Sequence, residues 1–218
     1  MATKKRATKQ EKVHVSVILD RTGSMEGIRN DTIGGFNTFL TDQKKLKIPM
    51  TMTLVQFDSQ DPYEVIHDFK DINKVNKLTR KTYVPRAMTP LLDAIGRGIN
   101  DLEAKFAKLA KKDRPKKVVM AIITDGYENA SREFNRPQIK KMIEAKKEND
   151  KWQFVFLSAD LDSIQDAQSF GIAAGQTANF QATPQGVTNV YNMMSRSISS
   201  YYVGESASVD VEDTNDDS

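Results

Sequence analysis

Asp20 and Asp125 each stand at the end of a short, strongly apolar segment of the sequence. Hydroxyl side chains follow the first of them at two-residue intervals, at Thr22 and Ser24. Carboxylates and hydroxyls are hard oxygen ligands, which suit Mg²⁺ because this ion prefers oxygen and keeps some of its waters. The residue types therefore predict an oxygen-only site for Mg²⁺, provided that the fold brings the two aspartates together.

The apolar segments that precede the aspartates are typical of buried strands. They are short, mostly apolar and rich in β-branched or aromatic residues. The predicted strands cover residues 13–19, 52–57, 118–123 and 152–157. A weaker run at 63–69 follows a turn-like segment, which predicts a hairpin and an antiparallel edge strand.

Between these strands, apolar residues recur at steps of three and four, as they do on one face of a helix. The predicted helices lie within residues 25–40, 91–109, 139–143, 161–167 and 187–201. Buried strands that alternate with helices predict an α/β fold with a mostly parallel central sheet, covered by helices on both faces. In such a sheet, ligands bind outside the carboxyl ends of the strands, where Asp20 and Asp125 should meet.

Each of these polar residues also has an ordinary structural role. Thr22 or Ser24 would cap the first helix, and Thr89 would cap the helix that begins at Pro90. Asp125 would serve in a turn with the glycine that follows it. Their joint occurrence at strand ends favours a common site over separate caps.

Three segments, in order and spacing, resemble the metal-ion-dependent adhesion site (MIDAS) of von Willebrand factor type A (vWA) domains. They are Asp20-Arg21-Thr22-Gly23-Ser24-Met25, Thr89-Pro90-Leu91-Leu92-Asp93-Ala94-Ile95 and Ile123-Thr124-Asp125-Gly126. The resemblance covers about residues 13 to 200 and is strongest with stand-alone bacterial or phage members. It implies a Rossmann-like vWA fold in which Asp20, Thr22, Ser24, Thr89 and Asp125 hold the metal. Thr22 stands where the family usually has Ser, and the hydroxyl is retained.

The resemblance implies a protein-interaction module rather than an enzyme. Two aspartates neutralise a divalent ion and hydroxyls add no charge, so the ion can take one more anionic ligand. An acidic side chain of a protein partner would complete the coordination of Mg²⁺, with Mn²⁺ as the alternative ion. Met88 and Tyr127, which flank two of the segments, are the apolar candidates for contact with that partner.

A metal-dependent hydrolase of phosphate esters is the competing class. Many such enzymes place a second acid two residues after the strand-end aspartate as a proton carrier, and here that position is Thr22. The sequence has neither a phosphate-binding P-loop nor a dinucleotide-binding glycine motif, so a small-molecule substrate is not expected.

The composition narrows the remaining possibilities. The 218 residues include no cysteine and only 2 histidines, which excludes disulfide scaffolds and disfavours zinc sites built on sulfur or imidazole. No stretch approaches the ~18 apolar residues of a membrane span, and the first residues lack the apolar core of a signal peptide. We therefore expect a cytoplasmic protein with no membrane partner.

The formal net charge of +3 hides an uneven distribution. The segment 1–12 has a net charge of +4 and the segment 204–218 has a net charge of −6, and both have too little apolar content to pack. We expect a disordered basic tail at 1–12, one folded domain at 13–202 and a disordered acidic tail at 203–218.

Lysines also cluster before three of the predicted strands, near residues 44–47, 111–117 and 146–151. This places them at the amino ends of the strands, opposite the metal site. They would complement helix C-termini there, or they would form a polyanion-binding face, although no recognition motif favours nucleic acid. The acidic tail should leave the last helix on this side and dock on the lysines.

Overall fold

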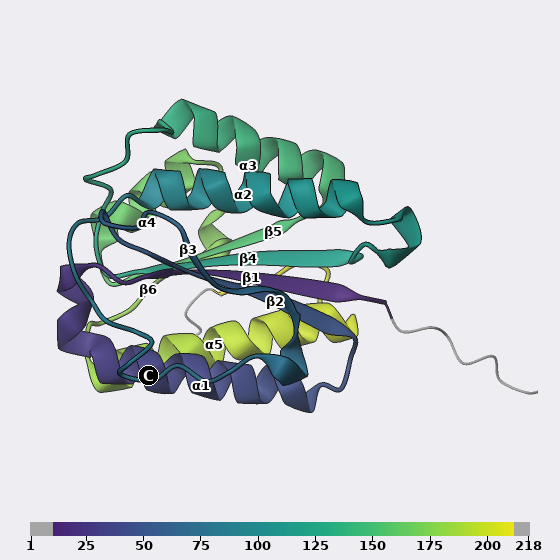
Figure 1. Cartoon of the computed structure of the whole chain (residues 1–218), viewed down its shortest axis with the longest axis horizontal. Helices are drawn as coiled ribbons and strands as arrows, with labels where there is room; N and C mark the ends of the chain where they lie inside the picture. The colour runs from purple at the N-terminus through teal and green to yellow at the C-terminus, as the bar shows by residue number, and fades with distance from the viewer. Residues whose placement is uncertain (1–10, 212–218) are drawn as a thin grey trace, which may run out of the picture.

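The structure is a computed structural model that describes residues 11–211. Its core is a 6-stranded sheet in the order β3-β2-β1-β4-β5-β6 (Figure 1). The strands are β1 (Val13–Asp20), β2 (Met50–Phe57), β3 (Glu64–Asp71), β4 (Lys117–Thr124), β5 (Gln153–Ser158) and β6 (Thr177–Asn179). Every neighbouring pair is parallel except β2 and β3. This arrangement confirms the predicted Rossmann-like sheet with one antiparallel edge strand.

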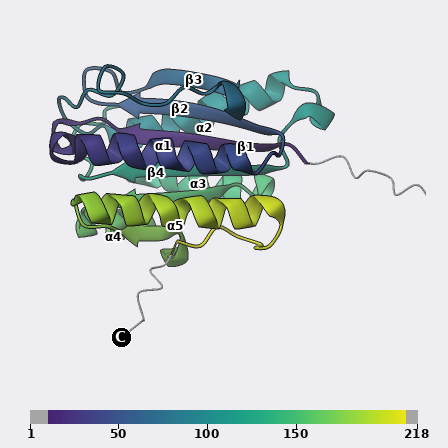
Figure 2. The ribbon, with the colours of Figure 1, turned by 90° about the horizontal axis from the view of Figure 1, so that it is seen from below.

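Helices cover both faces of the sheet. They are α1 (Arg29–Lys45), α2 (Leu91–Lys108), α3 (Arg136–Asp150), α4 (Leu161–Ser169) and α5 (Pro184–Val203). Short 3-10 helices occupy Gly23–Ile28, Ile72–Lys74, Lys111–Asp113 and Ala174–Gln176. Helices α1 and α5 lie side by side on one face, and α2 and α3 cover the other (Figures 1 and 2). None of the helices within residues 11–211 is both long and apolar enough to cross a membrane.

The order of the strands follows from their side chains. All residues of β1 are buried, as are all but the first of β4, because these strands lie at the centre of the sheet between two helical layers. In β3 only His67 is buried, as expected for a strand at an edge. The side chains of β1 and β4 contribute to separate hydrophobic clusters on the two faces of the sheet.

Strand β6 was not predicted from the sequence. It contains only Thr177, Ala178 and Asn179, so it lacks the apolar run that marks the other strands. Its conformation comes from pairing with β5, where Phe156 lies opposite Thr177. Tertiary pairing therefore sets this strand, and local sequence does not.

The folded unit extends beyond residue 202, the predicted end of the domain. Val209 and Val211 are fully buried, and the N–H of Val211 donates to the carbonyl of Gly175 at 2.7 Å. The prediction of a disordered tail is thus wrong for residues 203–211, because two valines in an acidic segment are enough to anchor it. The rest of that predicted tail, 212–218, and residues 1–10 of the basic tail lie outside the described residues.

At the amino ends of the strands, many of the lysines bind helix ends. Lys117 Nζ donates to the carbonyl of Tyr201 in the last turn of α5, and Lys147 Nζ donates to the carbonyl of Gly171. Lys146 pairs with Glu103 and Asp150. These contacts support the role of complementing helix C-termini. Most of the acidic residues that were expected to dock here lie in 212–218, outside the described part of the chain.

Candidate metal centre

Asp20, the last residue of β1, is fully buried, and both of its carboxylate oxygens accept hydrogen bonds. Its Oδ1 accepts from the backbone N–H of Thr22 at 2.6 Å, and its Oδ2 accepts from the hydroxyl of Thr124 at 2.5 Å. The hydroxyl of Tyr83 donates to its backbone carbonyl at 2.7 Å. Neighbouring strands and loops therefore fix the orientation of this carboxylate.

Burial raises the pKa of Asp20 to about 7, against the hydrogen bonds from Thr124 and Thr22, which lower it. The negative charge of Asp125 adds to the increase. A carboxylate with such a pKa is only partly ionised at neutral pH, and a nearby cation would favour its charged form. When ionised, the carboxylate of Asp20 is thus a buried anion that lacks a counter-charge.

The hydroxyls of the first loop meet the carboxylate at the end of β4. Ser24 Oγ donates to Asp125 Oδ1 at 2.6 Å, and Thr22 Oγ1 lies 3.2 Å from Ser24 Oγ. Burial raises the pKa of Asp125 as well, and the charge of Asp160 adds to this. The predicted juxtaposition of the two strand ends is therefore present in the fold.

Thr89 reaches the same place from the loop before α2. A methyl group on Gly126 would lie 3.7 Å from Ser24 Oγ and 3.8 Å from Thr89 Oγ1, so both hydroxyls border one small volume. Asn129 fixes the loop by two hydrogen bonds to Thr89. Its side-chain oxygen accepts from the backbone N–H of Thr89 at 2.9 Å, and its backbone N–H donates to the carbonyl of Thr89 at 3.1 Å.

The capping roles considered for these residues are not observed. Thr22 precedes the 3-10 helix and Pro90 precedes α2, and neither helix has a side-chain capping hydrogen bond. The hydroxyl of Thr22 lies beside Ser24, and that of Thr89 lies near Gly126. These side chains are therefore available for a common site.

The donor set fits a hard divalent cation. Residues 11–211 contain no group of three or more His, Asp or Glu side chains placed to hold a metal. A metal at this edge would depend on two carboxylates supplemented by neutral hydroxyls, which is an oxygen-only set suited to Mg²⁺. Carboxylate and hydroxyl oxygens from three separate segments of the chain thus lie at one edge of the sheet.

A buried ion-pair network, which was not predicted from the sequence, supports two of the loops. Asp58, fully buried after β2, accepts from Arg21 Nε at 2.8 Å and from Arg86 Nε at 2.9 Å. Burial opposes the charge of Asp58, but backbone N–H groups of Asp61 and Gln60 and the two arginines lower its pKa. Nothing in the sequence distinguishes Asp58 from the other acidic residue in this turn.

This network joins the loop after β1 to the loop that carries Thr89. Besides its pairing with Asp58, Arg86 donates its backbone N–H to the carbonyl of Arg21 at 2.9 Å. The N–H of Gly23 donates to the carbonyl of Ala87 at 3.1 Å. The spacing of the hydroxyls at the site is therefore set by contacts outside the site.

Apolar side chains border the cluster. Met88 is 55% exposed and Tyr127 is 57% exposed, although both are large and apolar. They directly flank Thr89 and Gly126 in the chain. The rim thus combines a polar centre with exposed apolar groups, which is a common feature of binding surfaces.

No protein-family model and no curated protein sequence matches this chain. Several solved structures are nevertheless similar in fold. The pilus adhesin SpaC from Lactobacillus rhamnosus GG, in an open conformation, has a TM-score of 0.66 at 14% identity, covering 91% of this chain and 31% of its own. A von Willebrand factor type A protein from Catenulispora acidiphila has a TM-score of 0.55 at 11% identity, covering 86% and 42%.

Proximal thread matrix protein 1 from the mussel byssus, described with a zinc-occupied MIDAS motif, is also similar. Its TM-score is 0.54 at 12% identity, and the match covers 87% of this chain and 46% of the mussel chain. The present chain therefore spans between about a third and a half of the length of these proteins. It has the fold of a vWA domain.

Proposed function

We propose that the chain is a metal-dependent protein-interaction module that holds a divalent cation at the carboxyl edge of its sheet. The observation that carries the proposal is the meeting of hydroxyls and a carboxylate from separate loops beside Gly126. The proposed ligands, direct or through water, are Asp20, Thr22, Ser24, Thr89 and Asp125. The zinc-occupied MIDAS described for the mussel protein supports a divalent ion at this position. We propose Mg²⁺, with Mn²⁺ as the alternative, because every donor is a hard oxygen.

When bound, a divalent ion supplies positive charge that stabilises both aspartates and attracts one further anionic oxygen. The chain prepares for this in two ways. Thr124 and the backbone of Thr22 hold the carboxylate of Asp20 in place, while the network around Asp58 fixes the loops that present the hydroxyls. The residues around the cluster thus orient the ligands before any ion binds.

An acidic side chain of a protein partner is the further ligand that we propose. Because Met88 and Tyr127 extend the rim with apolar surface, the partner should present its carboxylate between apolar groups. Such a contact would combine a metal-dependent polar centre with burial of apolar area. It would be lost when the metal is removed.

Two observations favour binding over hydrolysis. Thr22 occupies the position where many phosphate-ester hydrolases have a second acid, and His14 lies in the first half of β1, away from the carboxyl edge. We expect no release of nitrophenol from p-nitrophenyl phosphate in Mg²⁺. Metal-dependent release that is lost in Asp20→Asn would overturn the choice of a binding function.

Isothermal titration calorimetry with Mg²⁺ tests the metal site. The wild type and Asp162→Ala, which removes an exposed carboxylate from α4, should bind alike. Asp20→Ala and Asp125→Ala should lose measurable binding, and Ser24→Ala should weaken it. Equal binding to the wild type and Asp20→Ala would refute the site.

A pull-down from the source organism tests the partner. Proteins retained by the wild type in Mg²⁺ should be released by EDTA and should not be retained by Asp125→Ala. Removing the acidic side chains of a retained protein one at a time should identify a single residue required for binding. Retention that survives both EDTA and Asp125→Ala would contradict a metal-bridged interface.

A further inference from the structure

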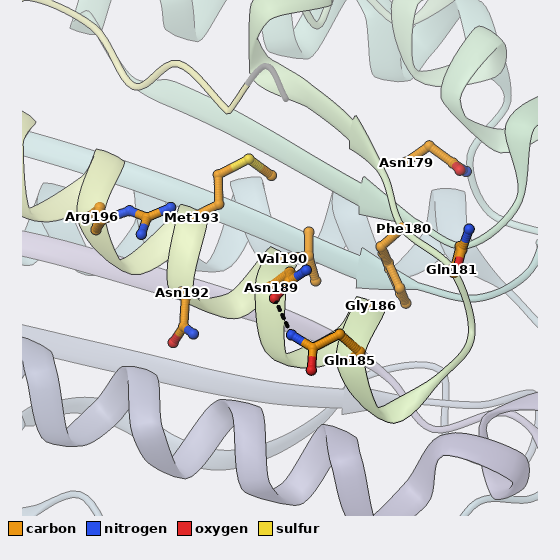
Figure 3. A pocket seen from close by; sticks show the side chains of 10 residues that line it. All are labelled: Asn179, Phe180, Gln181, Gln185, Gly186, Asn189, Val190, Asn192, Met193 and Arg196. Carbon is orange, nitrogen blue, oxygen red and sulfur yellow. Dashed lines mark hydrogen bonds between the residues drawn. The ribbon is translucent and has the colours of Figure 1, made fainter. Parts of the chain in front are cut away.

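A hollow of about 600 Å³ opens between the end of β6 and the exposed side of α5 (Figure 3). We call it the amide groove, because carboxamides and one guanidinium line it and no carboxylate does. Its polar side chains are Asn179, Gln181, Gln185, Asn189, Asn192 and Arg196. None of them belongs to the loops of the metal centre.

The helix side of the groove is a single stripe. Gln185, Asn189, Asn192 and Arg196 follow one another at steps of four, three and four residues, so they share one face of α5. At 1.5 Å of rise per residue, the stripe is about 16 Å long. This length equals about five residues of extended chain.

The loop after β6 closes the groove at the first turn of α5. A side-chain carbon on Gly186 would lie only 2.2 Å from the carbonyl oxygen of Gln181, so this glycine lets the loop lie directly against the first turn of α5. Beneath the polar side chains, Phe180 and Val190 are buried and form an apolar floor. The groove is therefore a built depression with defined walls.

Several polar groups of the groove are not used by the fold. Gln185 donates to Asn189 Oδ1 at 2.7 Å, but the side chains of Gln181, Asn192 and Arg196 form no hydrogen bond or ion pair within residues 11–211. An arginine beside free carboxamides provides a positive charge together with neutral donors and acceptors.

The groove also adjoins an open sheet edge. β6 is the last strand of the sheet, and no strand pairs with its outer side in the described part of the chain. The segment after α5 contacts the chain just before this strand, where Val211 binds Gly175. An unpaired strand edge offers backbone donors and acceptors to an extended polypeptide.

We propose that the amide groove binds an extended peptide segment of a partner, with an acidic side chain at the Arg196 end. A carboxamide carries the same donor and acceptor pair as a peptide group, so the stripe on α5 complements a peptide main chain. Arg196 supplies the charge that a carboxylate requires. A glycan is disfavoured because the one aromatic ring of the lining, Phe180, is only 6% exposed.

The proposal does not depend on the metal centre, and its test separates the two. A phage-displayed library of random heptapeptides is selected on the full chain in EDTA, and enriched peptides are synthesised and measured by fluorescence polarisation. They should carry an acidic residue and bind the wild type and Asp20→Asn equally. Binding to Arg196→Glu should fall at least tenfold, and Asn192→Leu should also weaken it.

Lys108→Glu provides the matched control, since it reverses an exposed charge on α2, across the sheet from α5. It should bind the peptides as the wild type does. Because none of the substituted side chains is buried, similar melting temperatures are expected for Lys108→Glu, Arg196→Glu and Asn192→Leu. Failure to enrich any peptide would overturn the proposal. So would peptides that bind Arg196→Glu and Asn192→Leu undiminished, or binding to a glycan array without binding to peptides.

Discussion

Replacing Asp20 by asparagine should stabilise the metal-free protein while abolishing the proposed metal site. The pKa of Asp20 is raised from 3.8 to about 7, because its charge is buried without a counter-charge. The folded state therefore keeps a proton between these pH values that the unfolded state has already lost. The stability contributed by this proton is fully present below pH 3.8 and is lost as the pH rises towards 7.

The size of the effect follows from the same two pKa values. Each pH unit between them corresponds to about 1.4 kcal/mol. The charge of Asp20 should thus cost on the order of 2 kcal/mol at pH 5 and on the order of 4 kcal/mol at pH 8. The asparagine of the variant carries no charge at either pH. It can also keep the local contacts, since Thr124 Oγ1 can accept from the amide while donating to the Gly126 carbonyl at 2.9 Å.

Urea unfolding in EDTA at pH 5 and pH 8 measures this difference. The gain of Asp20→Asn over the wild type should be about twice as large at pH 8. Asp162→Asn is the matched control, because it removes an exposed carboxylate from α4 and should change stability little at either pH. Added Mg²⁺ should stabilise the wild type and leave Asp20→Asn unchanged. A gain that is equal at the two pH values, or a wild type more stable than Asp20→Asn at pH 8, would refute the reasoning.

Three further predictions concern the affinity for Mg²⁺, the network around Asp58 and the packing of α1 against α5. The affinity for Mg²⁺ should fall about tenfold from pH 8 to pH 6 in calorimetric titrations, because protonated Asp20 must first lose its proton; an affinity independent of pH would contradict this. Asp58→Ala should lower the free energy of unfolding by about 1–3 kcal/mol, since it removes the buried partner of Arg21, which keeps its contacts with Glu64 and Gln56; an unchanged free energy in urea unfolding would argue against the network. Gly35→Ala should destabilise the fold by about 1–3 kcal/mol, because the added carbon would lie 2.3 Å from the ring of Tyr191. Gly34→Ala, on the open side of α1, should stabilise the fold slightly. Equal shifts of the two variants in thermal unfolding would contradict tight packing of α1 against α5.

The central strands and the meeting of Ser24 with Asp125 were predictable because their signals are local, whereas the position of Thr89 was implied by the resemblance to vWA domains. Buried parallel strands are mostly apolar, so β1 and β4 stand out in the sequence, and the aspartate at or just after the end of each one is conspicuous. In a parallel sheet, strand direction alone then places Asp20 and Asp125 at one edge. The convergence of Ser24 and Asp125 follows from this geometry.

Other features depend on contacts between distant segments and have no local signal. The three residues of β6 form a strand because β5 pairs with them, and Val209 and Val211 pack although their segment is acidic. Asp58 looks like any acidic residue in a turn until the fold places Arg21 and Arg86 against it. Sequence patterns report burial of whole elements well, but they do not report which charge pairs with which.

The hydrogen bond between Ser24 and Asp125 joins residues 101 positions apart. Such a site exists only when β1, β4 and the loop before α2 are all in place, so an unfolded or partly folded chain cannot form it. A cation bound there would therefore bind the native state alone, and its binding free energy would add to the stability of the whole domain. At a concentration about one hundred times its dissociation constant, this addition is about 2.7 kcal/mol. The concentration of free metal around the protein would then help to set how long the chain survives proteolysis, in addition to whether it engages a partner.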